Sequence, residues 1–511
     1  MRIRTALVAA VLLALLLALP TAGAFFSNPT SNDANSSGAD ILAPPTGLAA
    51  ACGPTITLDW TATVDTYATG YRVFRAGTPG GPYSQIAEIT PRTTVTYDDT
   101  PPAGIHYYVV RAYYLSWESV DGSEAVASTG TCAPPSVSGL SPSSGQRAGG
   151  TSVVVSGLYF TGATAVSFGA TPATGFVVDS DTQITATAPA GTLGTVDVQV
   201  STPLGGSANI PADDYTYVGN TYYVRTDGSD ANSGLSNDAA GAWLTIQKAA
   251  DTMVAGDMVR VQPGTYLETV TPLNAGTAAD PITYLADGVV VVDGGNVRCK
   301  AFDVAGTGDL VIDSFEITDQ PDCGGSDAAV DVVNANNVTV RNNVIHDTGR
   351  DAVNFGGTSA NGLVENNLIY NIDDDGSTPV GGGSHVYRNN TFAGTIGGWV
   401  LENGLASNLF EDNIFWAAAS IQNTALGTFN YNDYNATVLA GTGNFSSDPL
   451  FVNAASNDFH LSHIAAGQGA DSPAIDAGSD TAANLGLDTR TTRTDAVTDT
   501  GTIDLGYHYV G

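Results

Sequence analysis

A short phrase that recurs four times between Val338 and Trp416 constrains the fold more than any other feature. Each copy centres on two polar residues between apolar ones. These pairs are Asn342-Asn343, Asn366-Asn367, Asn389-Asn390 and Asp412-Asn413. Successive pairs lie 24, 23 and 23 residues apart. A repeat of this length with short strands and no helix is typical of a β-solenoid.

The pattern within each phrase also predicts how the solenoid is built. Apolar and polar residues alternate, as in a strand with one face inward. One turn alone cannot bury its apolar face, so stacked turns share a long core. The asparagines are expected to form ladders, in which each amide bonds to the next turn. At about 24 residues per turn, the segment predicts eight to ten turns. The long outer surface of such a solenoid suits a polymer.

The charge of the chain restricts its partners. Among 511 residues, 17 lysines and arginines stand against 51 aspartates and glutamates, a formal net charge of −34. Lys248 and Lys300 are the only lysines. This surface repels nucleic acid and anionic membranes, so both are excluded as partners. It also repels polyuronates unless divalent cations intervene.

The N-terminal residues predict export. Residues 1–24 combine Arg2 and Arg4, an apolar stretch and the small-residue site Ala22-Gly-Ala24, as in a secretory signal peptide. No later apolar run reaches about 18 residues, so no membrane span is expected. We therefore expect a secreted protein, extracellular or at the cell surface. Residues 25–42, rich in Ser, Asn, Asp and Gly, are expected to form a disordered leader.

Four cysteines in an exported chain can pair in three ways. Export permits disulfides. We predict Cys52–Cys132 and Cys299–Cys323, because each pair then lies within one proposed domain. Buried free thiols are the alternative.

Two β-sandwich modules are predicted before the solenoid, at residues 43–133 and 134–218. The first resembles a fibronectin type III domain in Ile56-Thr-Leu-Asp-Trp60 and Gly70-Tyr-Arg-Val-Phe-Arg75, which implies a core position for Trp60. The second resembles an immunoglobulin-like domain of the IPT/TIG type in Gly149-Gly-Thr-Ser-Val-Val-Val-Ser-Gly157. Such modules serve as spacers or adhesion units, and neither contains a cluster that suggests chemistry.

Residues 219–511 form the predicted solenoid domain. The segment from Tyr222 to Tyr266 resembles the opening of the right-handed parallel β-helix family related to pectate lyases. Asp458-Phe-His-Leu461 and Asp471-Ser-Pro-Ala-Ile-Asp-Ala-Gly478 resemble the closing turns of secreted β-helix proteins of the "choice-of-anchor Q" type. The resemblance implies an all-β chain with two sandwiches followed by a right-handed parallel β-helix.

One amphipathic helix is predicted, from Trp243 to Met253, and would cap the open end of the solenoid. Its inward residues would be Leu244, Ile246, Ala249 and Ala250.

Alignment of the repeats gathers aspartates at one corner of the solenoid. Asp347 falls over Asn371 and Asp351 over Asp375, with turns about 4.8 Å apart. The corner would hold Asp347, Asp351, Asp373, Asp374 and Asp375. These charges repel one another unless water or a cation screens them. Oxygen-rich clusters suit Ca²⁺, which takes six to eight oxygen ligands. Asx-turn capping is the alternative, as it is for a second oxygen-rich loop at residues 226–234.

The loop Asp373-Asp-Asp-Gly376 resembles the metal loop of calcium-dependent β-helix lyases. That resemblance implies elimination from a uronate polymer, with a lysine or arginine as base. The chain departs from the pattern, because no lysine follows Lys300 and arginine stays protonated. Arg350 and Arg388 are the remaining candidates for the base, and His346 and His385 are candidate acids or bases near neutral pH.

Two functional hypotheses follow. The first is a protein that engages extracellular polysaccharide through the β-helix, with calcium-dependent cleavage by a lyase or a two-carboxylate hydrolase as its catalytic form. The second is a non-catalytic adhesion or structural protein of the cell surface. Trp399 and Trp416 could stack on sugar, although core packing is the simpler interpretation. The sequence does not indicate an oligomeric state.

Overall fold

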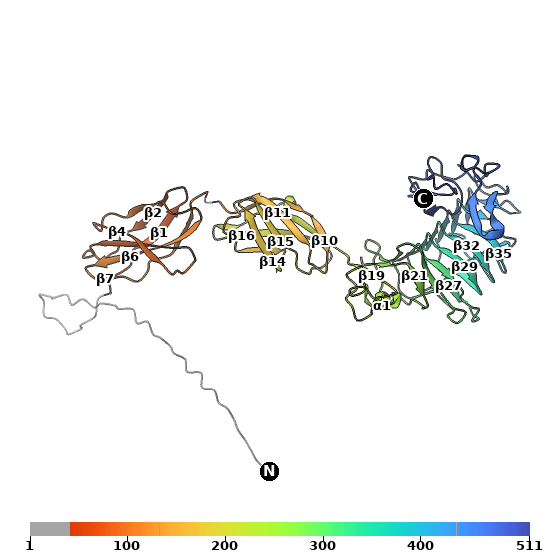
Figure 1. Ribbon diagram of the computed structural model, residues 1–511, viewed down its shortest axis with the longest axis horizontal. Coiled ribbons are helices and arrows are strands. Elements are labelled where there is room, and N and C mark those ends of the chain that lie inside the picture. The colour runs from red at the N-terminus through yellow and green to blue at the C-terminus, as the bar shows by residue number, and fades with distance from the viewer. Residues whose placement is uncertain (1–40, 132, 326, 436, 511) are drawn as a thin grey trace, which may run out of the picture. The chain divides into compact units, whose positions relative to one another are not determined.

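The computed structural model describes residues 41–131, 133–325, 327–435 and 437–510 (Figure 1). The predicted signal peptide and all but the last two residues of the predicted leader lie outside these ranges. The described chain is all-β apart from one short α-helix and three 3-10 turns, which confirms the predicted fold class. It divides into two compact units, one with the sandwiches and one with the solenoid.

The first sandwich packs two antiparallel sheets around Trp60, whose ring meets Tyr71 edge to face at 5.3 Å. Trp60 is buried, as predicted, and Leu42 joins the same core. One sheet contains β1 (Thr46–Ala51), β2 (Ile56–Thr61) and β5 (Thr96–Asp99). The other contains β3 (Gly70–Ala76), β4 (Ser84–Ile89), β6 (Ile105–Tyr114), β7 (Trp117–Glu118) and β8 (Ala125–Ser128).

The second sandwich also has two sheets, in which buried and exposed residues alternate along β11, β12 and β15. One sheet contains β9 (Ser136–Ser141), β11 (Ser152–Leu158), β14 (Gly175–Ser180) and β15 (Gln183–Thr187). The other contains β10 (Ser144–Gln146), β12 (Ala165–Phe168), β13 (Thr171–Pro172), β16 (Gly194–Thr202), β17 (Gly205–Gly206) and β18 (Asp214–Val218). The turn η1 (Pro211–Asp213) precedes β18.

The solenoid is built from three parallel sheets. The first sheet contains β19 (Thr221–Val224), β20 (Met258–Val261), β22 (Ile282–Ala286), β25 (Leu310–Asp313), β28 (Val338–Arg341), β31 (Leu363–Glu365), β34 (Val386–Arg388), β37 (Leu409–Glu411) and β40 (Thr428–Asn430). The second contains β21 (Gly264–Tyr266), β23 (Val290–Asp293), β26 (Glu316–Thr318), β29 (Val344–Thr348), β32 (Leu368–Ile372), β35 (Thr391–Ile396), β38 (Ile414–Phe415) and β41 (Asp433–Tyr434).

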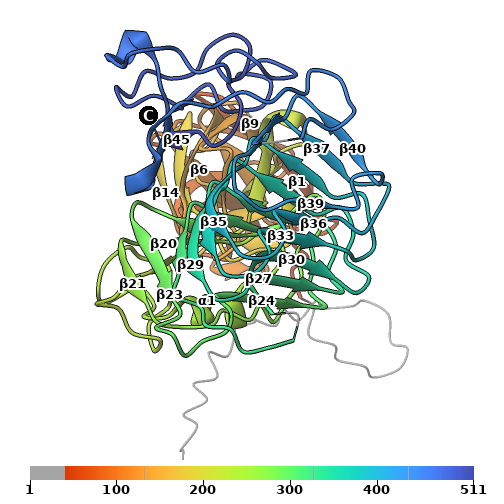
Figure 2. The same ribbon diagram turned by 90° about the vertical axis from the view of Figure 1, so that its right-hand side faces the viewer.

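The third sheet contains β24 (Phe302–Ala305), β27 (Ala328–Val333), β30 (Asp351–Gly356) and β33 (Ser377–Pro379), which stack one above another in Figure 2. The pair β36 (Leu401–Glu402) and β39 (Ile421–Gln422) follows in the later turns. Neighbouring strands in all three sheets are parallel, which confirms the predicted architecture.

The first sheet has nine strands and the second has eight, with one strand from each turn, so the stack agrees with the predicted eight to ten turns. Residues after Phe445 leave the stack, and Phe459 and Tyr507 pack on Leu368 and Tyr370 of the second sheet. This segment contains β42 (Phe451–Asn453), η2 (Ala454–Ser456), β43 (Asp458–Leu461), η3 (Ile464–Ala466), β44 (Arg490–Thr491) and β45 (Tyr509–Val510).

The second asparagine of each repeated pair forms the predicted ladder inside the solenoid. Each side-chain amide donates to the Oδ1 atom of the asparagine in the next turn. The ladder runs through Asn343, Asn367, Asn390, Asn413, Asn432 and Asn444. The first member of each pair has a positive φ, between 52° and 59°. Asn and Asp tolerate this conformation better than other non-glycine residues, so these positions can turn the chain between the first and second sheets.

The predicted helix is shorter than expected. α1 spans Ile246–Thr252 and buries Ile246, Ala249 and Ala250. Thr245 is the N-cap, and its side chain accepts a hydrogen bond from the Lys248 N–H. The prediction that Leu244 faces inward was wrong, because this residue precedes the cap and is 42% exposed.

The disulfide Cys299–Cys323 is present, as predicted, and closes a sequence separation of 24 residues. Cys132 lies outside the described residues, so the other predicted pair is not described.

Replacing both Cys299 and Cys323 with alanine should lower the free energy of unfolding of the solenoid by about 3 kcal/mol, because the unfolded chain gains loop entropy. Chemical denaturation would measure this loss, and an unchanged midpoint would contradict it.

Candidate functional site

Three of the five predicted aspartates converge where β30 begins and where the chain turns before β33. One carboxylate oxygen each from Asp351, Asp374 and Asp375 lies within 4.8 Å of the others. They line a pocket of about 280 Å³, called here the aspartate pocket. Its lining is completed by Arg350, Thr378, Gly398, Trp399 and Glu402.

Hydrogen bonds hold two of these carboxylates in place. Thr378 Oγ1 donates to Asp351 Oδ2 at 2.7 Å, and the Asp375 N–H donates to Asp351 Oδ1 at 3.3 Å. The Trp399 N–H donates to Asp375 Oδ1 at 2.5 Å. Asp351, Asp375 and Trp399 lie in successive turns, so the parallel register of the solenoid aligns the pocket.

Burial raises the pKa of Asp351 and of Asp375 to about 6. Nearby carboxylates act in the same direction, mainly Asp375 on Asp351 and Asp374 on Asp375. Ionising either carboxyl inside the pocket therefore costs free energy.

The raised values predict how stability depends on pH. The pKa of each carboxyl is higher in the folded chain, about 6, than the ordinary value of 3.8. Its contribution to the free energy of unfolding is therefore complete below about pH 4 and is lost as the pH rises through 6. In chelator, wild type should lose about 2 kcal/mol for each of the two carboxyls, or about 4 kcal/mol in all, relative to an Asp351→Asn/Asp375→Asn variant between pH 4 and 7. Denaturation of both proteins measures the difference, because other buried carboxyls titrate equally in each. Parallel pH profiles would contradict the assignment.

Arg350 is the positive charge in the pocket lining. Its Nη1 atom contacts Asp374 Oδ2 at 2.5 Å, and its Nη2 atom donates to the Gly325 carbonyl at 2.5 Å. An arginine in an ion pair remains protonated. In this state Arg350 can stabilise negative charge but cannot accept a proton.

The other predicted site residues lie elsewhere. Asp373 is exposed, and Asp347 contacts His346 Nδ1 at 2.7 Å on the second sheet. His346 also approaches Glu316 at 3.3 Å and stacks on Tyr370.

His385 is fully buried. Its Nε2 atom contacts the Gly381 carbonyl at 2.7 Å, and its Nδ1 atom accepts from the Gly362 N–H at 3.0 Å. Burial lowers the pKa of this imidazole. The structure therefore does not bring either histidine into the aspartate pocket.

Trp399, for which the sequence favoured core packing over sugar stacking, is a residue of the aspartate pocket. It is 38% exposed and lines the aspartate pocket. A signal was present, since Trp399 follows Asp375 by 24 residues, one turn of the repeat. Exposed tryptophan beside polar groups is a surface on which a sugar ring can stack. Trp416 is partly buried and packs beside Leu461.

Lys300 was not proposed as a site residue, yet it lies on the third sheet among carboxylates. Its Nζ atom is 2.6 Å from Asp331, 3.0 Å from Asp303 and 3.4 Å from Asp327. Burial alone would lower the pKa of Lys300, but the hydrogen bonds and charges of Asp331 and Asp303 raise it well above its usual value. Lys300 is therefore held as a cation.

Asp303 and Asp331, two partners of Lys300, begin a row of polar side chains on the third sheet that leads toward the aspartate pocket. Asp303, Asp331, Asn354 and Thr378 occupy equivalent positions in successive strands. Asn354 donates to Asp331 at 2.6 Å, and Thr378 donates to Asp351. A polar row therefore leads along the solenoid axis to the pocket.

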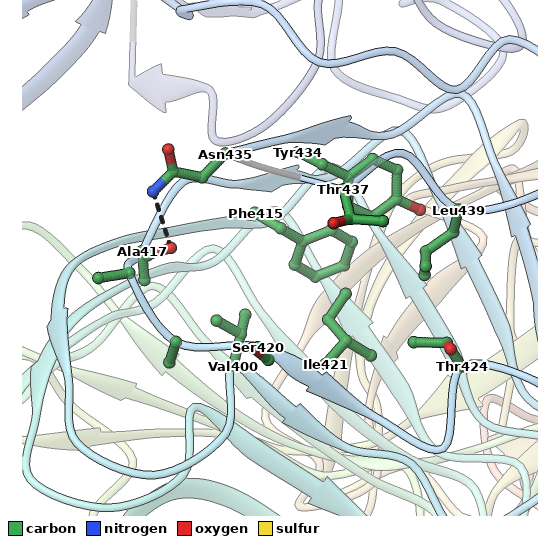
Figure 3. A pocket seen from close by; sticks show the side chains of 12 residues that line it. Val400, Phe415, Ala417, Ser420, Ile421, Thr424, Tyr434, Asn435, Thr437 and Leu439 are labelled. Carbon is green, nitrogen blue, oxygen red and sulfur yellow. Dashed lines mark hydrogen bonds between the residues drawn. The ribbon is translucent and has the colours of Figure 1, made fainter.

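A second hollow of about 300 Å³ lies among the last turns and contains no charged residue (Figure 3). Phe415 and Tyr434 form one wall, and Val400 and Ile421 face them. Asn435 Nδ2 donates to the Ala417 carbonyl at 3.0 Å beside it. The small side chains of residues 417–420 fill less of the core than Phe415 does, which leaves this space.

The oxygen-rich loop at residues 226–234 uses its side chains internally. Asp227 pairs with Arg225 at 2.8 Å. Asp230 accepts bonds from the backbone N–H groups of Leu244 and Thr245 and from the Thr245 hydroxyl. These bonds fit turn and helix-end chemistry, the alternative to a metal at this loop.

No helix among the described residues has the length and apolar character needed to cross a bilayer.

Solved structures with partial similarity include an Fn3-like protein from Clostridium thermocellum, 37% identical over 17% of this chain and 91% of that chain, with a TM-score of 0.16. XylC in complex with xylose is 13% identical over 42% of this chain and 65% of that chain, with a TM-score of 0.34. A structure with xylogluco-oligosaccharide is 16% identical over 34% of this chain and 41% of that chain, with a TM-score of 0.19. The chain thus spans less than two thirds of the last two proteins. Comparison with curated proteins returned no match.

Family comparisons identify two parts of the chain. The IPT/TIG domain family matches residues 135–218. The family described as a right handed beta helix region matches residues 283–440. With the Fn3-like sandwich at its N-terminal side, the chain therefore carries an IPT/TIG domain followed by a right-handed parallel β-helix.

Proposed function

We propose that this is a secreted extracellular protein that engages polysaccharide at the aspartate pocket of its β-helix, with Ca²⁺ bound there. The observation that carries the proposal is the convergence of Asp351, Asp374 and Asp375 beside the exposed Trp399. A carboxylate cluster and an aromatic surface are complementary means of holding a sugar polymer, one through hydroxyl or metal contacts and the other through ring stacking.

The residues of the pocket suit a hard cation. Three carboxylates supply up to six oxygens, the number at which Ca²⁺ coordination begins. Asp351 and Asp375 are buried side by side, and the one arginine in the lining pairs with Asp374. A bound Ca²⁺ would supply positive charge and coordination positions for an oxygen of the polymer. The carboxylates would hold it, and Thr378 and the Trp399 N–H would keep two of them oriented.

The polymer contacts follow from the residues around the cluster. Trp399 offers its exposed ring, and Glu402 and Arg350 line the same pocket. In the row from Asp303 to Thr378, the side chains of Asp331, Asn354 and Thr378 are buried, so a polymer would contact the pocket and Trp399 rather than this row.

The catalytic form of the proposal is calcium-dependent elimination from a uronate polymer. It requires a base, and Arg350 is the basic residue closest to the carboxylates. Arg350 would have to lose both its ion pair with Asp374 and its own proton before it could serve as the base, because arginine otherwise stays protonated. Inverting hydrolysis fits less well, because its two carboxyl groups stand about 6.5–9.5 Å apart to admit water, whereas these carboxylate oxygens lie within 4.8 Å.

Product analysis tests whether the protein cleaves its polymer. The full chain would be incubated with acidic and neutral polysaccharides, in calcium or in chelator. Ultraviolet absorbance would report unsaturated uronate, and reducing-end release would report hydrolysis. Calcium-dependent absorbance that Arg350→Ala abolishes would support elimination, with Arg388→Ala as a control outside the pocket. Absorbance that survives Arg350→Ala would remove Arg350 from the mechanism.

The second candidate is a non-catalytic adhesion or structural protein. The observation that favours it is that Arg350 and Lys300, the basic side chains described above near the third sheet, are both held in ion pairs. As paired cations they do not supply the base that elimination requires. Retention on polysaccharide without any product would select this candidate.

A further inference from the structure

A hollow among the last turns of the solenoid is used by neither function above and shares none of its described lining residues with the aspartate pocket. We call it the terminal hollow; Phe415 and Tyr434 form one wall, and Val400 and Ile421 face them (Figure 3). Its volume is about 300 Å³, and small-molecule pockets begin at about this size. A protein cavity of about 150 Å³ already admits a benzene molecule, so the terminal hollow has room for one or two rings.

A small residue at one position of the second-sheet repeat opens the terminal hollow. Ile372 and Ile396 pair in successive turns, and both are buried. In the next turn Phe392 pairs with Phe415, which sets an offset of 23 residues. The same offset puts Ala419 at the position of Ile396, and Ala419 lines the hollow. The isoleucine of two turns is therefore replaced by alanine in the third.

A second small residue lies on the facing side of the terminal hollow. Leu401 pairs with Ile421, so Ser420 takes the position that the buried Val400 holds one turn earlier. The Val400 N–H donates to the Ser420 carbonyl at 3.0 Å, in agreement with this alignment. Protein interiors are normally packed as densely as organic crystals. The loss of two large side chains in one turn therefore explains the unfilled space.

The described lining of the terminal hollow is neutral. Its rings stack, with the centroids of Phe415 and Tyr434 5.6 Å apart and their planes at 23°. Ser420, Thr424 and Thr437 are exposed lining residues, so polar residues lie where the hollow meets solvent. No charged side chain is among the lining residues that the structure describes. An ionised ligand would lose its hydration here without gaining a partner, whereas an aromatic ring can stack on the wall.

The Tyr434 hydroxyl is a polar group of this lining that lacks a partner. Tyr434 is 3% exposed, and its hydroxyl oxygen is buried with no hydrogen-bond partner among the described residues. Figure 3 shows the hydroxyl end of Tyr434 beside Leu439, which also lines the hollow. Buried hydroxyls are normally hydrogen-bonded, because an unpaired one carries the full cost of its lost hydration. An acceptor oxygen on a ligand in the hollow would remove that cost.

We propose that the terminal hollow binds a neutral aromatic compound of one or two rings that carries an acceptor oxygen. The ring packs against Phe415 and Tyr434 on one side and against Val400 and Ile421 on the other. The acceptor oxygen receives a hydrogen bond from the Tyr434 hydroxyl. This binding is reversible and needs neither calcium nor polysaccharide.

Equilibrium dialysis of the full chain with three probes of similar size tests the proposal. Coumarin is neutral and has a carbonyl acceptor, naphthalene is neutral and has none, and coumarin-3-carboxylate is an anion. Ultraviolet absorbance would quantify each probe. We expect both neutral probes to bind and the anion to stay free. Tyr434→Phe should raise the Kd for coumarin about fivefold, the effect of one lost hydrogen bond, and leave the Kd for naphthalene unchanged.

A variant that fills the terminal hollow provides an independent check. Ala419→Ile/Ser420→Val restores the residues of the preceding turn and should abolish the binding of both neutral probes. Its melting temperature should equal or exceed that of wild type, because the substitutions fill a cavity. Val438→Ala is the matched control, because Val438 is 45% exposed and outside the described lining. This control should bind both neutral probes as wild type does.

Three results would overturn the proposal. One is a wild-type chain that binds neither neutral probe, which would leave the hollow to water. Another is a Tyr434→Phe variant that loses affinity for coumarin and naphthalene equally, or for neither. The third is a folded filling variant that binds both neutral probes as wild type does. If the filling variant does not fold, Tyr434→Phe decides the test alone.

Discussion

Replacing Asn390 with alanine is expected to destabilise the solenoid by about 4 kcal/mol or more, because several buried polar groups lose their partners at once. The Asn390 amide donates to Asn413 Oδ1 at 3.0 Å and to the Val364 carbonyl at 2.8 Å. Its Oδ1 atom accepts from the Asn367 backbone N–H and side-chain amide at 2.9 and 3.0 Å. Asn390 is fully buried, so water cannot replace these bonds.

Denaturant unfolding of the full chain would measure this loss. Asn237→Ala is a matched control in the same unit, because the Asn237 side chain is exposed and bonds to Gln262 at 3.2 Å. The control should change the free energy of unfolding by less than about 0.5 kcal/mol. Equal effects of the two substitutions would show that the ladder does not stabilise the solenoid.

Replacing Asp375 with asparagine is expected to abolish most of the stabilisation that calcium gives. At a free calcium concentration of about 100 times the dissociation constant, a single site stabilises the folded state by about 2.7 kcal/mol. In chelator, the melting temperature of the variant should equal or exceed that of wild type. The substitution removes one of two buried carboxylates that repel each other. Thermal unfolding in calcium and in chelator measures both effects.

The control for this experiment is Asp373→Asn. Asp373 belongs to the same run of three aspartates but is exposed and outside the pocket. It should respond to calcium as wild type does. A wild-type protein that melts at the same temperature in calcium and in chelator would exclude a metal site, and an equal loss for Asp375→Asn in both conditions would assign Asp375 a purely structural role.

The sequence predicted the repeating part of the solenoid because each turn carries the same signal. Spacing alone placed Asn343 under Asn367 and Asp351 under Asp375, and the structure has both contacts. The same alignment placed Asp347 over Asn371, which also holds. Asp347 nevertheless lies outside the pocket, because it belongs to β29 of the second sheet and Asp351 begins β30 of the third.

Features outside the repeated phrase were harder to predict. Within Asp373-Asp374-Asp375, the direction of each side chain depends on the turn before β33, which alignment does not define. Trp399 and Lys300 reach the outer side of the third sheet, whose strands lack the repeated asparagine pair. The segment after Phe445 packs on the second sheet through Phe459 and Tyr507 without any repeat, so the spacing of the repeated phrase could not predict its path.

Retention on immobilised polysaccharide tests the central claim most directly. Wild type, Asp375→Asn, Trp399→Ala and Asp373→Asn would be compared in calcium and in chelator. If the aspartate pocket holds calcium and polymer together, wild type and Asp373→Asn should be retained in calcium and released by chelator, whereas Asp375→Asn and Trp399→Ala should pass through in both. Retention of Asp375→Asn and Trp399→Ala equal to that of wild type would contradict the account and place polysaccharide binding elsewhere on the chain.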